Sequence, residues 1–196
     1  GKLNEVADKT TTTTQSFYAI VDANGSTANY TESLLQRQTI TNITGTKVYT
    51  SQNDVDYNTR KGWYMPLTYG TTSTGERVLY PPLLIDGNVF FTTAILDVSD
   101  PCSSAGSSKL MEVNAENGKM ITNFSILNGT EATAGMIVSG GLINTASMIS
   151  YVDSNGNDMV AIQLPSTGDS TTGSGGGSPK QQVVSPNRRI MWQQRQ

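Results

Sequence analysis

The sequence predicts an all-β fold built from antiparallel hairpins. Three observations support this prediction: a composition rich in Thr, Ser, Gly and Asn, short apolar runs with a period near two, and Asn-Gly or Asp-Gly pairs between those runs. Only 36% of the 196 residues are hydrophobic and 15% are charged. Because this composition favours turns, strand edges and hydroxyl-bearing surfaces over helices, we expect thin, layered burial.

The expected strands are short and rich in β-branched or aromatic residues, as at residues 15–21, 89–95 and 147–152. Asn-Gly and Asp-Gly pairs between such runs tolerate the positive φ angles that a two-residue hairpin demands. Hairpins are therefore predicted at 83–91 and 147–162. Helical patterns are scarce, and we expect one short helical turn at 31–38, capped by Thr31.

A third unit, residues 110–119, ends in an Asn-Gly-Lys turn. This form is similar to the outer hairpin of a quinoprotein-type propeller blade. Successive four-stranded blades of about 40 to 50 residues suit the spacing of the turns, so the sequence predicts a β-propeller. Because the chain supplies only about four blades of that length, we expect an incomplete ring.

The composition also predicts how the chain is divided. Residues 1–165 are expected to form the propeller blades. Residues 166–187 include the Gly/Ser run 173–178, which cannot bury apolar surface, and are predicted to be a flexible loop or linker. Residues 188–196, with the apolar run 190–192, are predicted to form a closing strand and tail.

Charge and cysteine content narrow the choice of partners. The net charge of −3 and pI near 4.9 provide no basic field for a phosphate backbone, which argues against DNA binding by this chain. The sequence has no run of about 18 apolar residues, so we predict no membrane-spanning helix. The single cysteine, Cys102, has no internal disulfide partner, so it pairs with a cysteine outside this chain or is a buried, inert thiol.

The absence of histidine removes Ser-His-Asp and Cys-His catalysis. Carboxylate-pair hydrolysis stays formally open through Glu76, Asp86, Asp97 and Asp100. However, Asp86 belongs to a turn dipeptide, and Glu76 beside Arg77 indicates a structural ion pair. We therefore predict no catalytic and no cofactor-binding residue.

Asp153, Asn155 and Asn157 are the metal candidates, because their oxygens alternate as in a calcium loop. The pattern is incomplete: Asp158 stands where glycine is expected and Leu164 where a bidentate Glu is needed, so a hairpin turn is preferred. Residues 22–25 and 53–56 offer similarly incomplete sets. The aromatic pair in residues 62–64 is either a sugar-stacking platform or strand packing, and packing is favoured.

A series of short motifs runs along the chain at residues 1–3, 15–22, 61–67, 75–78, 90–93, 100–103, 110–113 and 117–119. These motifs resemble, in the same order, those of the PilC/PilY family of type IV pilus tip adhesins. The resemblance covers roughly residues 1–125 and fades to a weak match at 188–192.

This resemblance implies the C-terminal propeller of a large exported protein at the pilus tip, cell surface or outer membrane. It implies a role in pilus biogenesis, surface adhesion and twitching motility, and in some members DNA uptake. The implied partners are the remaining blades and N-terminal region of the same polypeptide, minor pilins or other pilus components, and a host or abiotic surface. The receptor and its binding residues stay unknown.

Calcium binding in this family belongs to an upstream propeller loop that this chain lacks, so no cofactor is expected here. The sequence therefore predicts a non-enzymatic interaction module. The alternative is a carbohydrate-active or quinoprotein-like propeller enzyme. A quinone cofactor would need a funnel of charged residues and tryptophans, and the chain has only Trp63 and Trp192.

Overall fold

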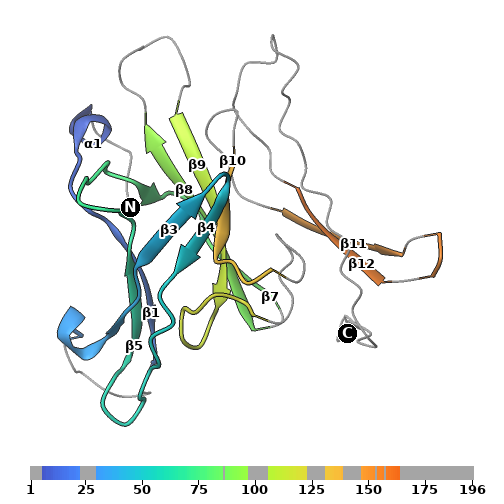
Figure 1. The fold of residues 1–196 in the computed structure, drawn as a ribbon, viewed down its shortest axis with the longest axis horizontal. Helices are drawn as coiled ribbons and strands as arrows, with labels where there is room; N and C mark the ends of the chain where they lie inside the picture. The colour runs from blue at the N-terminus through green and yellow to red at the C-terminus, as the bar shows by residue number, and fades with distance from the viewer. Residues whose placement is uncertain are drawn as a thin grey trace, which may run out of the picture.

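The computed structural model describes most of the first 163 residues and confirms the predicted all-β architecture (Figure 1). Its strands form three sheets, accompanied by a five-residue helix, α1 (Val6–Thr10), and a single 3-10 turn, η1 (Glu32–Leu34). No helix in this part of the chain is long and apolar enough to cross a bilayer. The described residues are 6–22, 30–85, 87–96, 106–122, 131–138, 147–152, 154–156 and 158–163.

A three-stranded sheet is formed by β1 (Ser16–Ile20), β5 (Gly62–Pro66) and β2 (Gln36–Arg37), in the order β1-β5-β2. β1 runs antiparallel to β5, whereas β2 runs parallel to it. Alternate residues point to opposite faces of a strand. One face of this sheet accordingly buries Trp63 and Met65, while the other exposes Tyr18 and Ile20.

The seven-stranded sheet is antiparallel throughout and carries most of the core. Its order is β3-β4-β10-β9-β8-β6, and β7 also pairs with β8. The late strand β10 therefore lies between the early strand β4 and the central strand β9. The strands are β3 (Ile40–Thr44), β4 (Lys47–Thr50), β6 (Arg77–Val78), β7 (Leu83–Ile85), β8 (Asn88–Leu96), β9 (Gly106–Asn114) and β10 (Gly135–Val138).

The central strands β8 and β9 are buried on both faces. Phe91 and Met111, which face each other in register, belong to the core that contains Trp63. The alternate residues Phe90 and Leu110 are buried as well. A strand covered on both sides loses the simple alternation of apolar and polar residues. This two-sided burial suits a sheet that is packed between other layers.

Aromatic side chains join the two sheets. The rings of Phe17 on β1 and Phe91 on β8 are stacked, with centroids 4.1 Å apart and an interplanar angle of 6°. Phe17 also lies against Trp63, at a centroid distance of 5.7 Å. Offset aromatic pairs add about 0.5–1.5 kcal/mol beyond the area that they bury. Phe17 therefore fixes the three-stranded sheet onto the larger one.

The predicted hairpins at 83–91 and 147–162 are confirmed. β7 pairs with β8, and β11 (Ser147–Val152) pairs with β12 (Asp158–Gln163). The helical turn is shorter than predicted and Thr31 makes no cap bond, because its hydroxyl lies 2.7 Å from that of Ser33 instead. The predicted loop at 166–187 and closing strand at 188–196 lie outside the described residues.

Gly62 is required where β1 and β5 approach each other. Its φ is 132°, and an added Cβ would overlap the carbonyl oxygen of Ala19. We expect Gly62→Ala to lower the free energy of unfolding by on the order of 2–3 kcal/mol, because strain and a backbone clash coincide. Urea denaturation followed by circular dichroism measures this loss.

Gly45 provides the matched control for this prediction. Its φ of 58° is also positive, but a Cβ there would meet nothing within 4 Å. Gly45→Ala should therefore cost only the left-handed backbone strain, about 1–2 kcal/mol. Equal losses at both positions would show that the close approach of the strands is not the reason for Gly62.

Candidate functional site

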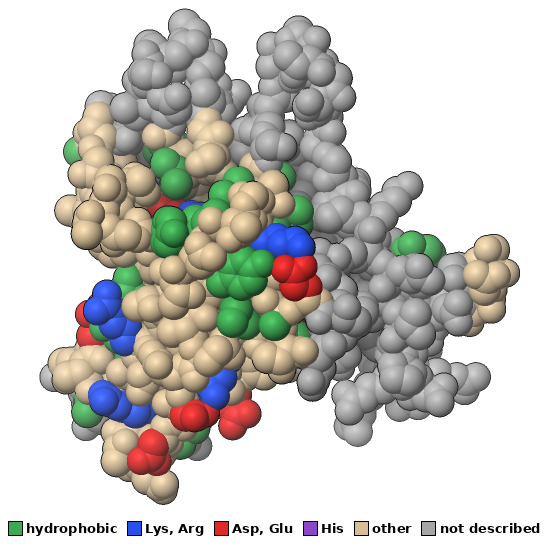
Figure 2. Space-filling view, in the orientation of Figure 1, with side chains coloured by type: hydrophobic (Ala, Val, Ile, Leu, Met, Phe, Trp, Pro, Cys, Tyr) green, Lys and Arg blue, Asp and Glu red, His purple; other side chains and the backbone are tan. Residues whose placement is uncertain are grey.

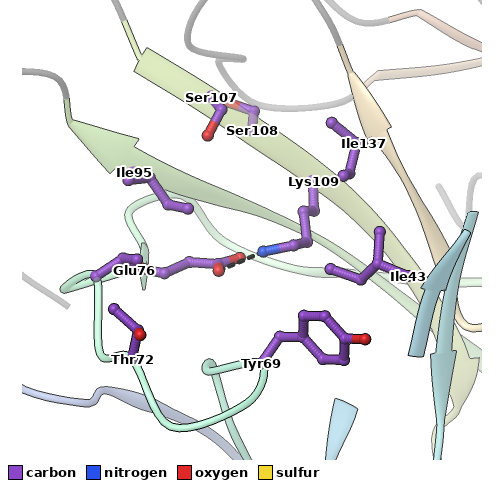
Figure 3. Close-up of a pocket in the computed structure, with 10 residues that line it drawn as sticks. Ile43, Tyr69, Thr72, Glu76, Ile95, Ser107, Ser108, Lys109 and Ile137 are labelled. Carbon is purple, nitrogen blue, oxygen red and sulfur yellow. Dashed lines mark hydrogen bonds and ion pairs between the residues drawn. The ribbon is translucent and has the colours of Figure 1, made fainter. Parts of the chain in front are cut away.

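A pocket of about 260 Å³ opens beside β8, β9 and β10 (Figure 3). It is enclosed by these strands, by β3 and by the loop that follows β5. Its lining combines apolar side chains, hydroxyl groups and one pair of opposite charges. The lining residues are Ile43, Tyr69, Thr72, Thr74, Glu76, Ile95, Ser107, Ser108, Lys109 and Ile137.

The charges belong to Glu76 and Lys109, which form a buried ion pair. Their side chains are 2% and 8% exposed, respectively. Thr93 stands opposite Lys109 in the register of β8 and β9, so both side chains project from the same face. The Thr93 hydroxyl donates to Glu76 Oε1 at 2.5 Å and accepts the Lys109 backbone N–H at 3.2 Å. The Glu76 carboxylate therefore links the loop that follows β5 to β8 and β9.

The sequence suggested Arg77 as the ion-pair partner of Glu76, but the structure pairs Glu76 with Lys109. Arg77 donates instead to backbone carbonyls, from Nε to Gly75 at 2.9 Å and from its terminal nitrogen to Thr11 at 3.0 Å. Adjacent residues on an extended chain point to opposite sides. Proximity in sequence was for this reason a poor guide to the ion pair.

A second polar cluster surrounds the turn at 114–119. The Trp63 indole is fully buried, and its Nε1 donates to the Ala115 carbonyl at 2.9 Å. Gly118 lies so close to the ring that an added Cβ would be 2.5 Å from it. Trp63 is therefore a packing residue, and the sugar-stacking alternative for residues 62–64 is wrong for this side chain.

Gln38 fixes the same turn from another direction. This fully buried side chain donates from Nε2 to the carbonyls of Asn53 at 2.8 Å and Asn117 at 2.7 Å. Its Oε1 accepts the Ser51 hydroxyl at 2.6 Å. A buried amide is tolerated only when its donors and acceptors are satisfied. Gln38 meets this condition by joining three loops.

Two comparisons with known proteins agree. The chain is 38% identical over 69 residues to the Type IV pilus biogenesis factor PilY1 homolog of Xylella fastidiosa, which covers 35% of this chain and 5% of that protein. Its fold matches the crystal structure of the Pseudomonas aeruginosa PilY1 C-terminal domain with a TM-score of 0.69 and 19% identity. The chain is PilY1-like. No protein-family model matches it.

The PilY1 match covers 95% of this chain and 40% of the solved one. It confirms the predicted fold class, a β-propeller. Within the described residues the sheets do not close, so the ring is incomplete. The pocket and the turn at 114–119 are thus features of a part of a PilY1-like propeller.

The metal candidates stay predictions in this PilY1-like fold. Asn155 is exposed in the turn between β11 and β12, whereas Asp153 and Asn157 lie outside the described residues. In the segment 53–56, Asp54 pairs with Lys119, and Asp56 accepts the Asn58 backbone N–H at 3.0 Å. The described part of the chain contains no cluster of three His, Cys, Asp or Glu side chains placed to hold a metal.

Of the four candidate carboxylates, the structure describes only Glu76; Asp86, Asp97 and Asp100 lie outside the described residues. Lys109 was missed by the sequence prediction. Lys109, Met111 and Val113 are two residues apart on β9 and so share one face of the strand. Met111 and Val113 belong to the core, which places a lysine in a core-facing row. A charged residue in such a row indicates a buried ion pair. This pattern is the signal in the sequence that could have identified Lys109.

An exposed network on β4 gives this PilY1-like chain a testable pH response. Glu131 accepts hydrogen bonds from Lys47 and, at 2.8 Å, from the Tyr49 hydroxyl. The Lys47 bond first, and the Tyr49 bond second, hold the pKa of Glu131 below its ordinary value of 4.5. The network therefore stabilises the fold at pH values above 4.5. This stabilisation is lost as the pH falls through the lowered pKa of Glu131.

We expect Lys47→Met to raise the pKa of Glu131 towards its ordinary value, and Tyr49→Phe to raise it less. NMR titration of the Glu131 side-chain carbonyl measures both shifts. Lys61→Met, which removes a surface cation elsewhere, is the control. If Tyr49→Phe had the larger effect, the hydroxyl rather than the ammonium would dominate the pKa.

Proposed function

We propose that this chain is a non-enzymatic interaction module that acts in type IV pilus biogenesis. The observation that carries the proposal is the 38% identity over 69 residues to a protein named as a pilus biogenesis factor. The chain spans 5% of that relative's length and 40% of the solved PilY1 chain. We therefore propose that the module supplies a binding surface to a larger protein.

The finer proposal places this module in an extracellular adhesin at the pilus tip, cell surface or outer membrane. There it supports surface adhesion and twitching motility, and DNA uptake where the parent protein serves it. Its partners are minor pilins or other pilus components and a host or abiotic surface. Calcium, where bound, belongs to upstream polypeptide. The lack of histidine and the structural bonds of Glu76 support a binding role over catalysis.

The surface of the described residues supports binding to proteins or neutral ligands rather than to nucleic acid. Figure 2 shows positive and negative side chains scattered among polar ones, without a continuous field of one sign on that face. On the outer face of the three-stranded sheet, Tyr18 is 45% and Ile20 is 49% exposed. Neighbouring apolar side chains of this kind form a contact surface for another blade of the same polypeptide.

Deletion of the parent gene tests the proposal. We expect fewer surface pili, weaker attachment and smaller twitching zones, each restored by the wild-type gene. A gene encoding Trp63→Ala, which loses a core side chain, should restore them poorly, whereas the exposed control Lys61→Gln should restore them fully. Unchanged pilus number, attachment and motility after deletion would refute the proposal.

A further inference from the structure

We infer that the pocket beside Glu76 and Lys109 binds one pyranose ring of an uncharged saccharide. The inference rests on the proposed function and deepens it, because it names the class of ligand that a surface-binding module would take. Three features carry it: a balanced pair of charges with hydrogen-bonding capacity to spare, an aromatic wall, and a volume suited to a single ring.

The ion pair retains both donors and acceptors for a ligand. A carboxylate offers about four lone-pair sites and an ammonium three N–H donors. Within the described residues, Thr93 and Lys109 occupy two sites on Glu76, and Glu76 takes one donor of Lys109. Neighbouring sugar hydroxyls each donate and accept, so a pair of them matches a carboxylate beside an ammonium.

The opposite charges also determine the net charge of the ligand. An anionic group near Lys109 would meet the Glu76 carboxylate, and a cationic group near Glu76 would meet the Lys109 ammonium. Because like charges repel strongly where burial lowers the dielectric, either ion is disfavoured. An uncharged ligand rich in hydroxyl groups uses both side chains without this penalty.

The remaining walls fit a sugar ring. In Figure 3, the Tyr69 ring lies below the Glu76–Lys109 pair, with Ile43 beside it. Tyr69 is 46% exposed, and its hydroxyl lies 3.4 Å from Asn42 Oδ1, which anchors the far end of the ring. A pyranose has an apolar C–H face that packs on aromatic and aliphatic side chains. Thr72 and Thr74 supply hydroxyl groups to the lining.

The size of the pocket suits one ring. Its volume of about 260 Å³ lies just below the range of roughly 300–1,000 Å³ that is usual for drug-sized ligands. Apolar walls with a few convergent polar groups are the usual composition of small-molecule sites. A single terminal or branch residue of a glycan therefore fits, with the rest of the glycan outside.

Saturation-transfer NMR on the full chain tests the inference. The probes are methyl glycosides of glucose, galactose, mannose, N-acetylglucosamine and N-acetylgalactosamine, with N-acetylneuraminic acid and glucosamine as charged comparators. We expect millimolar binding of at least one uncharged glycoside. Tyr69→Ala should weaken it roughly tenfold or more, because ring packing is lost. Glu76→Gln combined with Lys109→Met should do the same, because charge-assisted hydrogen bonds are lost.

Tyr18→Ala is the matched control, because Tyr18 is as exposed as Tyr69 but lies on β1 and does not line the pocket. Circular dichroism verifies that each variant is folded. The inference is overturned if no uncharged glycoside binds, if a charged comparator binds more tightly, or if binding survives both pocket changes.

The assay does not depend on pili, so the two proposals fail separately. Absent sugar binding together with a piliation defect in the deletion strain would remove only the saccharide site. Sugar binding by the chain together with normal piliation would remove only the pilus role.

Discussion

Replacing Trp63 with alanine should lower the free energy of unfolding by about 3–5 kcal/mol, the usual cost of removing a buried aromatic side chain. The indole is fully buried, packs against Phe17 and Gly118, and donates to the Ala115 carbonyl. Its loss opens a cavity between the two sheets and leaves that carbonyl without its partner. Urea denaturation followed by circular dichroism provides the measurement.

Two further variants separate packing from hydrogen bonding. Trp63→Phe keeps a ring but loses the N–H donor, so we expect a smaller loss than for alanine. Gly118→Ala keeps the indole but places a Cβ 2.5 Å from it, so we expect a substantial loss there too. A cost for Trp63→Ala below about 1 kcal/mol, the average for point substitutions, would contradict the role given to this side chain.

Replacing Lys109 with methionine should also be severe, lowering the free energy of unfolding by about 3–5 kcal/mol. The change leaves the Glu76 carboxylate buried with only the Thr93 hydroxyl as its described partner. Removing the second charge as well, with Glu76→Gln, should recover most of the stability, because Gln Oε1 still accepts from Thr93. A double-mutant cycle by urea denaturation measures this coupling.

Lys47→Met is the control for this cycle, because Lys47 also pairs with a glutamate, Glu131, but at an exposed site. We expect little change in stability there, since exposed ion pairs are screened by water. If Lys109→Met were as mild as Lys47→Met, the Glu76–Lys109 pair would be accessible to solvent rather than buried.

The local features of the fold were predictable because neighbouring residues determine them. Asn155-Gly156 supplies the turn between β11 and β12, and the apolar run at 89–95 forms the centre of β8. The Asn-Gly-Lys turn at 117–119 indicated a blade hairpin, and Gly118 there adopts a φ of 71°. Turn chemistry and strand periodicity are sequence-local, so one sequence suffices to recognise them.

The long-range pairings were not predictable from these patterns. Nothing in the residues of β10 specifies insertion between β4 and β9, or in those of β2 a parallel partner. Such pairings depend on which buried faces match across the whole chain. Thr31 failed as a cap for a local reason, since its hydroxyl lies beside that of Ser33 instead of binding a backbone N–H.

The site was predictable only in part. Glu76 was identified as a carboxylate with a structural bond, but its partner lies 33 residues away on β9. The pocket walls come from five segments that only the tertiary structure brings together. The choice between packing and sugar stacking at Trp63 also depended on burial, which is a property of the folded chain.

The place of β10 constrains the order in which this domain can mature. Ribosomes release a polypeptide from its N-terminus, at about 5–20 residues per second during synthesis. β3 and β4 are thus delivered seconds before residues 135–138, the segment that separates them from β9. Throughout that interval one side of β4 is an open template for foreign strands. This edge of β4 therefore stays unpaired until residues 135–138 have been made.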